Sequence, residues 1–292
     1  MNRPYTDEEL QRLHQELYDI LREIVRVCDE LSIPYFIQGG TAIGAFFEQS
    51  ILPWDDDIDV GITREHYTRF LREAPSHFSP DYFMQWVGSD PHTPFYFVKV
   101  RKNNTLFVEK DFSHLPIHHG IFIDVFPFDK VPDNPWLQKV HRDVSNFFNC
   151  CFMGKDIWMW KHVRKCEISH PTNRGLLPCL ANWLVDVVLT KRAIFCLLSR
   201  TQAMFNHSRL KTTYYNMVLM PRDHISVASI ESPQLVPFGP LHVWAPSDLE
   251  TYLRHHYPRL RRYIPKEEQQ NHRPELLSFD APNDRGPIRI EN

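Results

Sequence analysis

Apolar positions repeat at helical spacing in the first thirty residues of the chain and at strand spacing in the next ninety. Leu, Ile, Val and Cys side chains recur three and four residues apart between Leu10 and Leu31. This spacing predicts an amphipathic helix over residues 6–31. Thr6 and Glu9 match a capping box at its start.

Short apolar runs bounded by turn residues predict a series of strands between residues 35 and 126. The runs cover residues 35–38, 57–62, 82–87, 95–102, 105–109 and 121–126. Helices are expected at residues 42–49 and from Thr63, the predicted N-cap, to about Arg72. The pattern predicts an α+β fold with a mixed sheet flanked by helices.

The pattern becomes helical and rich in Trp, Phe and Cys over residues 135–209, with a break at 169–175. Short strands return at 235–243, and Ser247 with Glu250 predicts a second capping box before a helix that ends near His256. We therefore expect three parts. They are a core with the N-terminal helix (1–130), a helical insertion (131–220) and a segment that packs back on the core (221–292).

Composition limits the class of protein. The chain has 292 residues, of which 42% are hydrophobic and 24% charged, which excludes wholesale disorder. Its net charge of −3 argues against a dedicated nucleic-acid binder. The first residues do not resemble a secretory signal, so a cytoplasmic location is expected.

The most apolar window, residues 176–198, contains Asp186, Lys191 and Arg192, too many charges for an ordinary membrane-spanning helix. Peripheral attachment of this window to a membrane remains an alternative. The six cysteines form no CxxC pair and are expected to be free thiols. A zinc site is the alternative for one group of residues, Cys150, Cys151, His162 and Cys166.

Four aspartates lie within residues 55–59, bracketed by apolar side chains. In a strand, Asp57 and Asp59 share one face while Ile58 points into the core. Their Cα atoms would lie about 6.5–7 Å apart, close enough for both carboxylates to bind one hard divalent cation. Asp55 has the same parity and could join them, whereas Asp56 is expected to face away as a local cap. An EF-hand is excluded, because the sixth and twelfth positions lack the required Gly and Glu.

Gly39-Gly40-Thr41 lies between a predicted strand and a predicted helix. Glycines allow the backbone to approach a phosphate, and the helix start offers unpaired N–H groups. A glycine pair alone is more often only a turn. Followed by the paired aspartates, it matches the arrangement that phosphoryl and nucleotidyl transfer require.

Asp124 is an isolated carboxylate within the apolar run 121–126. It could complete a metal site or act as general base, and the alternative is a structural role in binding backbone amides. Lys99 and Arg101 share a strand face and could neutralise phosphates, although an exposed strand face is also consistent. Candidate hydrogen-bonding histidines are His118, His119 and His272.

Residues 38–45 and 51–60 resemble the signature of the LicD family, which includes bacterial phosphocholine transferases and is related to fukutin-type ribitol-phosphate transferases. The resemblance continues at residues 99–105, 120–127, 236–238, 245–246 and 271–272. It departs at Tyr257-Pro258-Arg259, where the family usually has Tyr-Gly-Asp, and residues 134–220 match poorly.

The resemblance implies a nucleotidyltransferase-type core over residues 1–130. It implies that Asp57 and Asp59 bind Mg²⁺ or Mn²⁺, with Asp124 as the third carboxylate and Asp55 as a further candidate ligand. The implied enzyme moves a phospho-alcohol group, such as phosphocholine, from a CDP-activated donor to a hydroxyl of a glycan or glycolipid. Donor phosphate would be held by residues on two segments, namely Gly39, Gly40 and Thr41, and Lys99 or Arg101.

Two other functions remain open at this point. One is a nucleotidyltransferase that transfers NMP from an NTP and releases pyrophosphate, and the other is a non-catalytic binding protein on the same fold. If the donor carries choline, an aromatic cage is expected, since quaternary ammonium groups bind ring faces. The candidate cage residues are Trp158, Trp160 and Trp183, for which ordinary core packing is the alternative.

Overall fold

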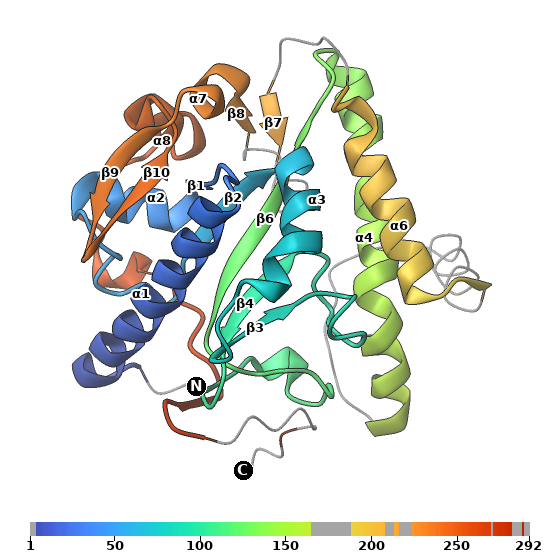
Figure 1. Ribbon diagram of the computed structural model, residues 1–292, viewed down its shortest axis with the longest axis horizontal. Helices are drawn as coiled ribbons and strands as arrows, with labels where there is room; N and C mark the ends of the chain where they lie inside the picture. Colours follow the sequence, from blue (N-terminus) through green and yellow to red (C-terminus); the bar gives the residue numbers. More distant parts are fainter. Residues whose placement is uncertain are drawn as a thin grey trace.

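The computed structural model describes residues 4–164, 188–207, 213–215, 224–269, 271–281 and 288. A mixed sheet lies at its centre (Figure 1). The strands follow the order β1 (Phe36–Ile37), β2 (Asp59–Thr63), β6 (Phe122–Lys130), β4 (Val98–Lys102) and β3 (Tyr82–Gln85). Strands β2 and β6 are parallel and the other pairs are antiparallel. The predicted mixed sheet flanked by helices is confirmed.

Three of the helices that flank the sheet come from the N-terminal part of the chain. Helix α1 (Asp7–Glu30) packs against β4 and β6 through its apolar face, and its capping box between Thr6 and Glu9 is confirmed. Helix α3 (Arg64–Glu73) packs against β2 and β6, with Thr63 as N-cap as predicted. Helix α2 (Gly39–Phe47) starts three residues earlier than predicted, so the glycine pair forms its first turn.

Strand β6 extends four residues beyond its predicted end. The added residues, 127–130, keep pairing with the end of β2 and then with β7 (Thr213–Tyr215), which pairs in turn with β8 (His224–Ser226). Backbone pairing with distant segments therefore sets the length of this strand. The strand length predicted from the local apolar run alone is too short.

The C-terminal residues return to the core. Strands β9 (Gln234–Phe238) and β10 (Leu241–Ala245) form a hairpin that contacts α2 and β1, and β11 (Leu276–Ser278) pairs with β5 (Leu106–Val108). Helices α7 (Val227–Glu231) and α8 (Leu249–His256) flank the hairpin. Four short 3-10 helices are described, at Ala74–Ser76, Lys110–Phe112, Ala203–Phe205 and Lys266–Glu268.

The second capping box was wrongly predicted. Asp248 is the N-cap of α8, and its carboxylate accepts the N–H of Thr251 at 3.0 Å. The backbone N–H of Ser247 instead donates to Ser229, so Ser247 belongs to the preceding turn. An Asp at the N-cap also places a negative charge at the positive end of the helix.

The described part of residues 131–220 contains α4 (Pro135–Arg164) and α6 (Lys191–Gln202), which pack side by side (Figure 1), together with a 3-10 helix and strand β7, so it is not wholly helical. Helices α4 and α6 share a small apolar cluster that is separate from the main core and includes Phe152, Ile194 and Leu198. Within the described ranges, no helix combines the length and apolar character needed to cross a bilayer.

Several predictions fall outside the residues that the structure describes. These are the break at 169–175, Trp183, Cys166 and most of the window 176–198, together with the side chains of Trp158, Trp160 and His162. Cys150 and Cys151 are free thiols, as are Cys28 and Cys196.

A buried ion pair joins the insertion to the core. The Asp129 carboxylate, at the end of β6, is fully buried and accepts Arg64 Nε at 2.8 Å and Asn206 Nδ2 at 2.7 Å. The Arg64 guanidinium also donates to Gln202 Oε1 of α6 at 2.8 Å. One carboxylate therefore ties α3, β6 and the end of α6 together.

We expect Asp129→Ala to destabilise the protein by about 3–5 kcal/mol, because it leaves the Arg64 charge buried without its partner. Urea unfolding followed by circular dichroism would measure the loss. Asp143→Ala is the matched control, since Asp143 pairs with Lys139 on an exposed helix surface, and it should change stability by less than about 1 kcal/mol. Equal stabilities for the two variants would contradict the structural role of Asp129.

Candidate active site

Two aspartates and a lysine form a row across three neighbouring strands. Asp59, the first residue of β2, is the register partner of Asp124 on the parallel strand β6. Asp124 is in turn the partner of Lys99 on β4. Since register partners point to the same face of a sheet, these side chains converge on one face.

The acidic segment before β2 alternates in exposure. Asp55, Asp57 and Asp59 are partly exposed, whereas Asp56 and Ile58 are buried. The shared orientation predicted for the three odd-numbered aspartates matches this alternation. Asp57 lies just outside β2, which begins two residues later than the sequence pattern predicted.

The glycine pair packs directly against these carboxylates. A Cβ atom at Gly39 would lie 3.0 Å from Asp59 Oδ2, and one at Gly40 would lie 2.8 Å from Asp55 Oδ2. Gly39 also has a positive φ of 58°, which disfavours any other residue. The absence of side chains at both positions therefore lets the start of α2 approach the carboxylates.

Thr41 connects the two segments. Its hydroxyl oxygen accepts the backbone N–H of Asp59 at 2.8 Å, and the residue is buried. The backbone N–H of Gly39 donates to the Tyr252 hydroxyl of α8 at 3.2 Å. The three residues that the sequence assigned to a phosphate cradle thus lie beside the acidic cluster, and Thr41 uses its hydroxyl to position the start of β2.

Burial, together with neighbouring negative charge, raises the pKa values of three aspartates in this cluster. Burial, reinforced by the charges of Asp57 and Asp56, raises the pKa of Asp55 to about 8. Burial and the charges of Asp57, Asp124 and Asp55 raise the pKa of Asp59 well above its ordinary value. Burial also raises the pKa of Asp124 to about 6, against the opposing effect of the Lys99 ammonium.

Lys99 is the cation closest to this cluster in the described site. Its Nζ atom lies 2.9 Å from Asp124 Oδ1. The ammonium also lies 3.4 Å from the ring centroid of Phe122 and 4.3 Å from that of Phe95. Lys99 is only 2% exposed, so the alternative of an exposed strand face was wrong. One lysine offsets one carboxylate and leaves the others uncompensated.

Arg101 shares the face of Lys99 but has internal partners. The guanidinium donates to Gln85 Oε1 at 2.6 Å and to the Gly120 carbonyl at 2.7 Å, and burial lowers its pKa to about 10. The two histidines near this network also have structural partners. His118 Nε2 lies 2.9 Å from Asn103 Oδ1, and His119 Nε2 lies 3.2 Å from the Leu115 carbonyl.

Asp56 is held by the two ends of the chain. Its carboxylate accepts the Tyr5 hydroxyl at 2.8 Å and the His272 backbone N–H at 2.9 Å from both oxygens. Arg273 stacks over the Tyr5 ring at 4.6 Å and lies 3.3 Å from Glu9. Sequence reasoning missed these partners, because Tyr5 and His272 lie 51 and 216 residues away. The motif Asn271-His272 was the one available signal.

The donor set fits a hard divalent cation. Carboxylate oxygens are the ligands that Mg²⁺ and Mn²⁺ prefer, and burial together with the charges of neighbouring aspartates raises the pKa values of Asp55 and Asp59. Ligand atoms of Asp56, Asp57 and His272 also lie within 4.8 Å of one another. Asp56 is the weaker ligand of this second group, because the Tyr5 and His272 hydrogen bonds already occupy its oxygens.

Part of this chain is similar to known proteins. Residues 32–170 match the family model described as "LicD/FKTN/FKRP, nucleotidyltransferase domain". The lipopolysaccharide cholinephosphotransferase LicD of Haemophilus influenzae is 30% identical over 145 residues, which cover 46% of this chain and 51% of that protein. An uncharacterised protein of Rickettsia typhi is 30% identical over 122 residues, which cover 40% of this chain and 36% of that protein.

The similarity thus extends over about half the length of the Haemophilus relative and less of the rickettsial one. The matched region contains both glycines and all the aspartates of the cluster, and it excludes Tyr5 and His272. The predicted family resemblance is confirmed over residues 32–170, which are just under half of this chain and match the LicD/FKTN/FKRP nucleotidyltransferase-domain model.

Proposed function

We propose that this protein is a metal-dependent transferase that moves a phospho-alcohol group from a CDP-activated donor to a glycan hydroxyl. The observation that carries the proposal is the row of Asp59 and Asp124 on adjacent strands, against which the glycine start of α2 packs. The partial similarity to a lipopolysaccharide cholinephosphotransferase favours phosphocholine as the transferred group and a saccharide as the acceptor.

In this proposal, Asp57 and Asp59 hold the metal ion, with Asp55 and Asp124 close enough to contribute. The ion would supply positive charge to the diphosphate oxygens and to the leaving CMP. The start of α2 offers backbone N–H groups and the positive end of a helix to the same phosphates. Attack falls on the phosphorus that carries the alcohol, so CMP leaves and no pyrophosphate forms.

Lys99 and Asp124 have a further part in the proposal. Because Lys99 is held between Asp124 and the Phe122 ring, its charge is fixed rather than free to follow a substrate. Asp124, with its raised pKa of about 6, is a group that could accept a proton from the acceptor hydroxyl. The Arg101 guanidinium already donates to acceptors inside the protein. In the proposal, Arg101 therefore stabilises strands β3 and β4 and does not contact phosphate.

Asp59→Asn should lower the transfer rate by about three orders of magnitude, because it removes a charge from the electrostatic machinery at the phosphates. The protein would be given Mg²⁺ or Mn²⁺, a glycan extract, and in turn CDP-choline, CDP-ribitol, CDP-glycerol or each NTP. Mass spectrometry would then detect CMP or pyrophosphate. CMP released from a CDP-alcohol by the wild type and not by Asp59→Asn supports the proposal. Pyrophosphate from an NTP, with every CDP-alcohol intact, would identify a nucleotidyltransferase instead.

Mn²⁺ titration by calorimetry distinguishes the two ligand groups. If Asp57 and Asp59 hold the ion, Asp59→Asn should weaken Mn²⁺ binding by about tenfold or more, and His272→Ala should change it by less than about threefold. The His272 side chain is 77% exposed, so its replacement should not affect folding. The reverse order of the two effects would assign the ion to Asp56, Asp57 and His272.

The stabilisation that proton binding at Asp55 and Asp124 gives the metal-free protein should be lost as pH rises from about 4 to 8. The folded protein binds protons at Asp55 and Asp124 more tightly than the unfolded chain does, with pKa values of about 8 and about 6. Protonation therefore stabilises the folded state, and this stabilisation is lost as pH rises through those values. Differential scanning fluorimetry should show that Mg²⁺ raises the melting temperature more at pH 8 than at pH 5.5. A larger Mg²⁺ effect at pH 5.5 would exclude carboxylate ligation.

A further inference from the structure

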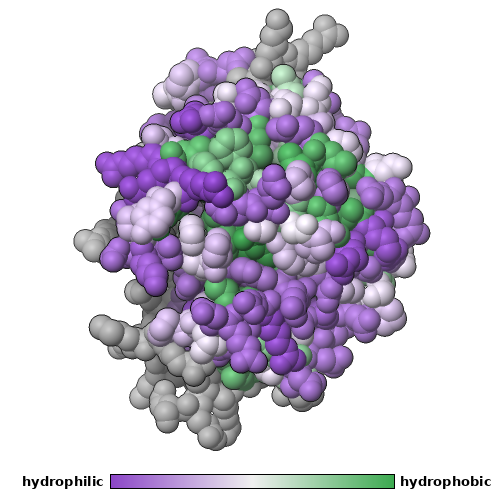
Figure 2. Space-filling model, turned by 90° about the vertical axis from the view of Figure 1, so that its left-hand side faces the viewer, coloured by the Kyte–Doolittle hydropathy of each residue, from purple (hydrophilic) through white to green (hydrophobic). Residues whose placement is uncertain are grey.

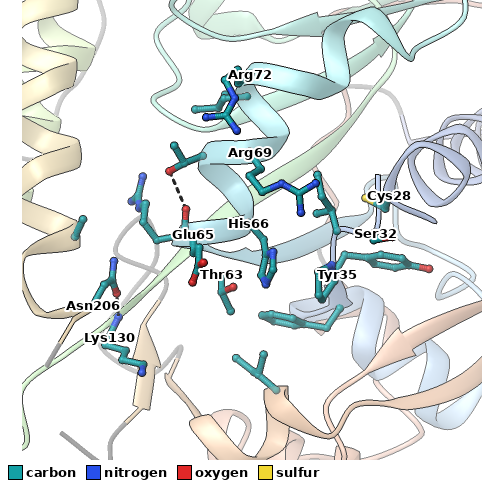
Figure 3. Close-up of a pocket in the computed structure, with 18 of the residues that line it drawn as sticks. Cys28, Ser32, Tyr35, Thr63, Glu65, His66, Arg69, Arg72, Lys130 and Asn206 are labelled. Carbon is teal, nitrogen blue, oxygen red and sulfur yellow. Dashed lines mark hydrogen bonds between the residues drawn. The ribbon is translucent and has the colours of Figure 1, made fainter. Parts of the chain in front are cut away.

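A second cavity, of about 1220 Å³, lies beside α3 and shares no lining residue with the carboxylate cluster. It is bounded by three parts of the chain (Figure 3): the turn between α1 and β1, one side of α3, and the segment from α6 to Asn206, with α7 and Trp244 at its rim. Its size is that of an organic ligand of several rings, and pockets at such junctions between parts of a fold are frequent ligand sites.

The cavity contains a buried polar atom that lacks a partner. His66 lies in the first turn of α3, between Thr63 and Tyr35 in Figure 3. Its Nδ1 atom is buried and makes no hydrogen bond. An unpaired buried polar atom is unfavourable, and a polar group that enters the cavity can pair with this one.

Both donors and acceptors line the cavity together with His66. Glu65 supplies carboxylate oxygens and Arg200 supplies guanidinium N–H groups, and neither has an ion pair within the described ranges. Of the other cations, Arg64 pairs with Asp129, whereas Arg69 and Arg72 share the one carboxylate of Glu73. The lining also includes Asp29 and Glu231, so it carries no strong excess of positive charge that would select a phosphate alone.

Apolar and aromatic surface completes the cavity. Tyr35 and Phe36 lie on the β1 side, and Trp244, which is 36% exposed, lies at the rim. The space-filling view in Figure 2 shows apolar patches set among polar side chains on the face that it displays. Donors and acceptors beside aromatic rings match a polyhydroxylated ring, whose hydroxyls both donate and accept while its C–H faces are apolar.

The cavity and the carboxylates lie at opposite ends of strand β2. Thr63, which lines the cavity, is the last residue of β2, and Asp59 is the first. Four residues of strand span about 13 Å, and residues of equal parity point to the same face. A saccharide of a few units could span this distance.

We propose that this cavity binds a neutral oligosaccharide and serves as a remote subsite for the glycan acceptor. The acceptor role rests on the proposed transferase function, whereas the binding itself does not. Binding here would hold the glycan chain at one end of β2 while the hydroxyl to be modified reaches the carboxylates at the other end.

The test is binding of fluorescently labelled full-length protein to a printed array of bacterial and mammalian glycans, without donor or metal. We expect neutral glycans to bind, and both His66→Phe and Trp244→Ala to weaken binding about tenfold or more. Trp136→Ala is the matched control, because Trp136 is exposed on α4 away from the cavity. Asp59→Asn should bind as the wild type does, so a failure of the transferase assignment and a failure of this proposal give different results.

Folding is monitored separately, by the melting temperature of each variant. His66→Phe should leave it unchanged or raise it, since the replaced nitrogen has no partner to lose. Calorimetry with inorganic phosphate would test whether the cavity binds phosphate instead of a saccharide. Three results would each overturn the saccharide subsite. The first is that no neutral glycan binds, and the second is that neither cavity variant changes glycan binding. The third is that the protein binds phosphate and that His66→Phe abolishes this binding.

Discussion

Repulsion between like charges is the constraint on which the site depends. The pairing of β2 with β6 brings Asp59 beside Asp124, and the preceding loop adds Asp55 and Asp57. Burial, reinforced by neighbouring carboxylates, raises the pKa of Asp55, and burial raises that of Asp124, so both groups favour protonation. The surrounding fold must therefore hold the carboxylates together against their mutual repulsion.

Several contacts hold the carboxylates in place without neutralising them. Thr41 accepts the Asp59 N–H, the Tyr5 hydroxyl and the His272 N–H donate to Asp56, and Lys99 pairs with Asp124. On the opposite face, β2 and the first part of β6 carry buried apolar side chains such as Val60 and Val125, which lie in the main core. Packing on that side supplies the stability that lets the other face carry repelling charges.

Sequence reasoning succeeded where the cause is local. The capping box of α1, the strand positions and the parity of Asp55, Asp57 and Asp59 follow from side chains within a few residues of one another. It failed where the cause is distant in sequence. The added length of β6 depends on pairing with β2 and β7, and the burial of Arg101 depends on Gln85 and Gly120. No local pattern carries that information, and the same holds for a cavity built from three parts of the chain.

The hydrogen-bond partners of Asp56 also show that residues outside the family match contribute to the site. The family match covers residues 32–170, yet Asp56 is held by Tyr5 from before that range and by His272 from after it. Arg273 strengthens this closure by stacking on Tyr5 and pairing with Glu9. Because Tyr5 and His272 both donate to Asp56, the position of the acidic loop depends on segments that flank the matched region. The matched region supplies the aspartates of the cluster, and the flanking segments help to fix the loop that carries them.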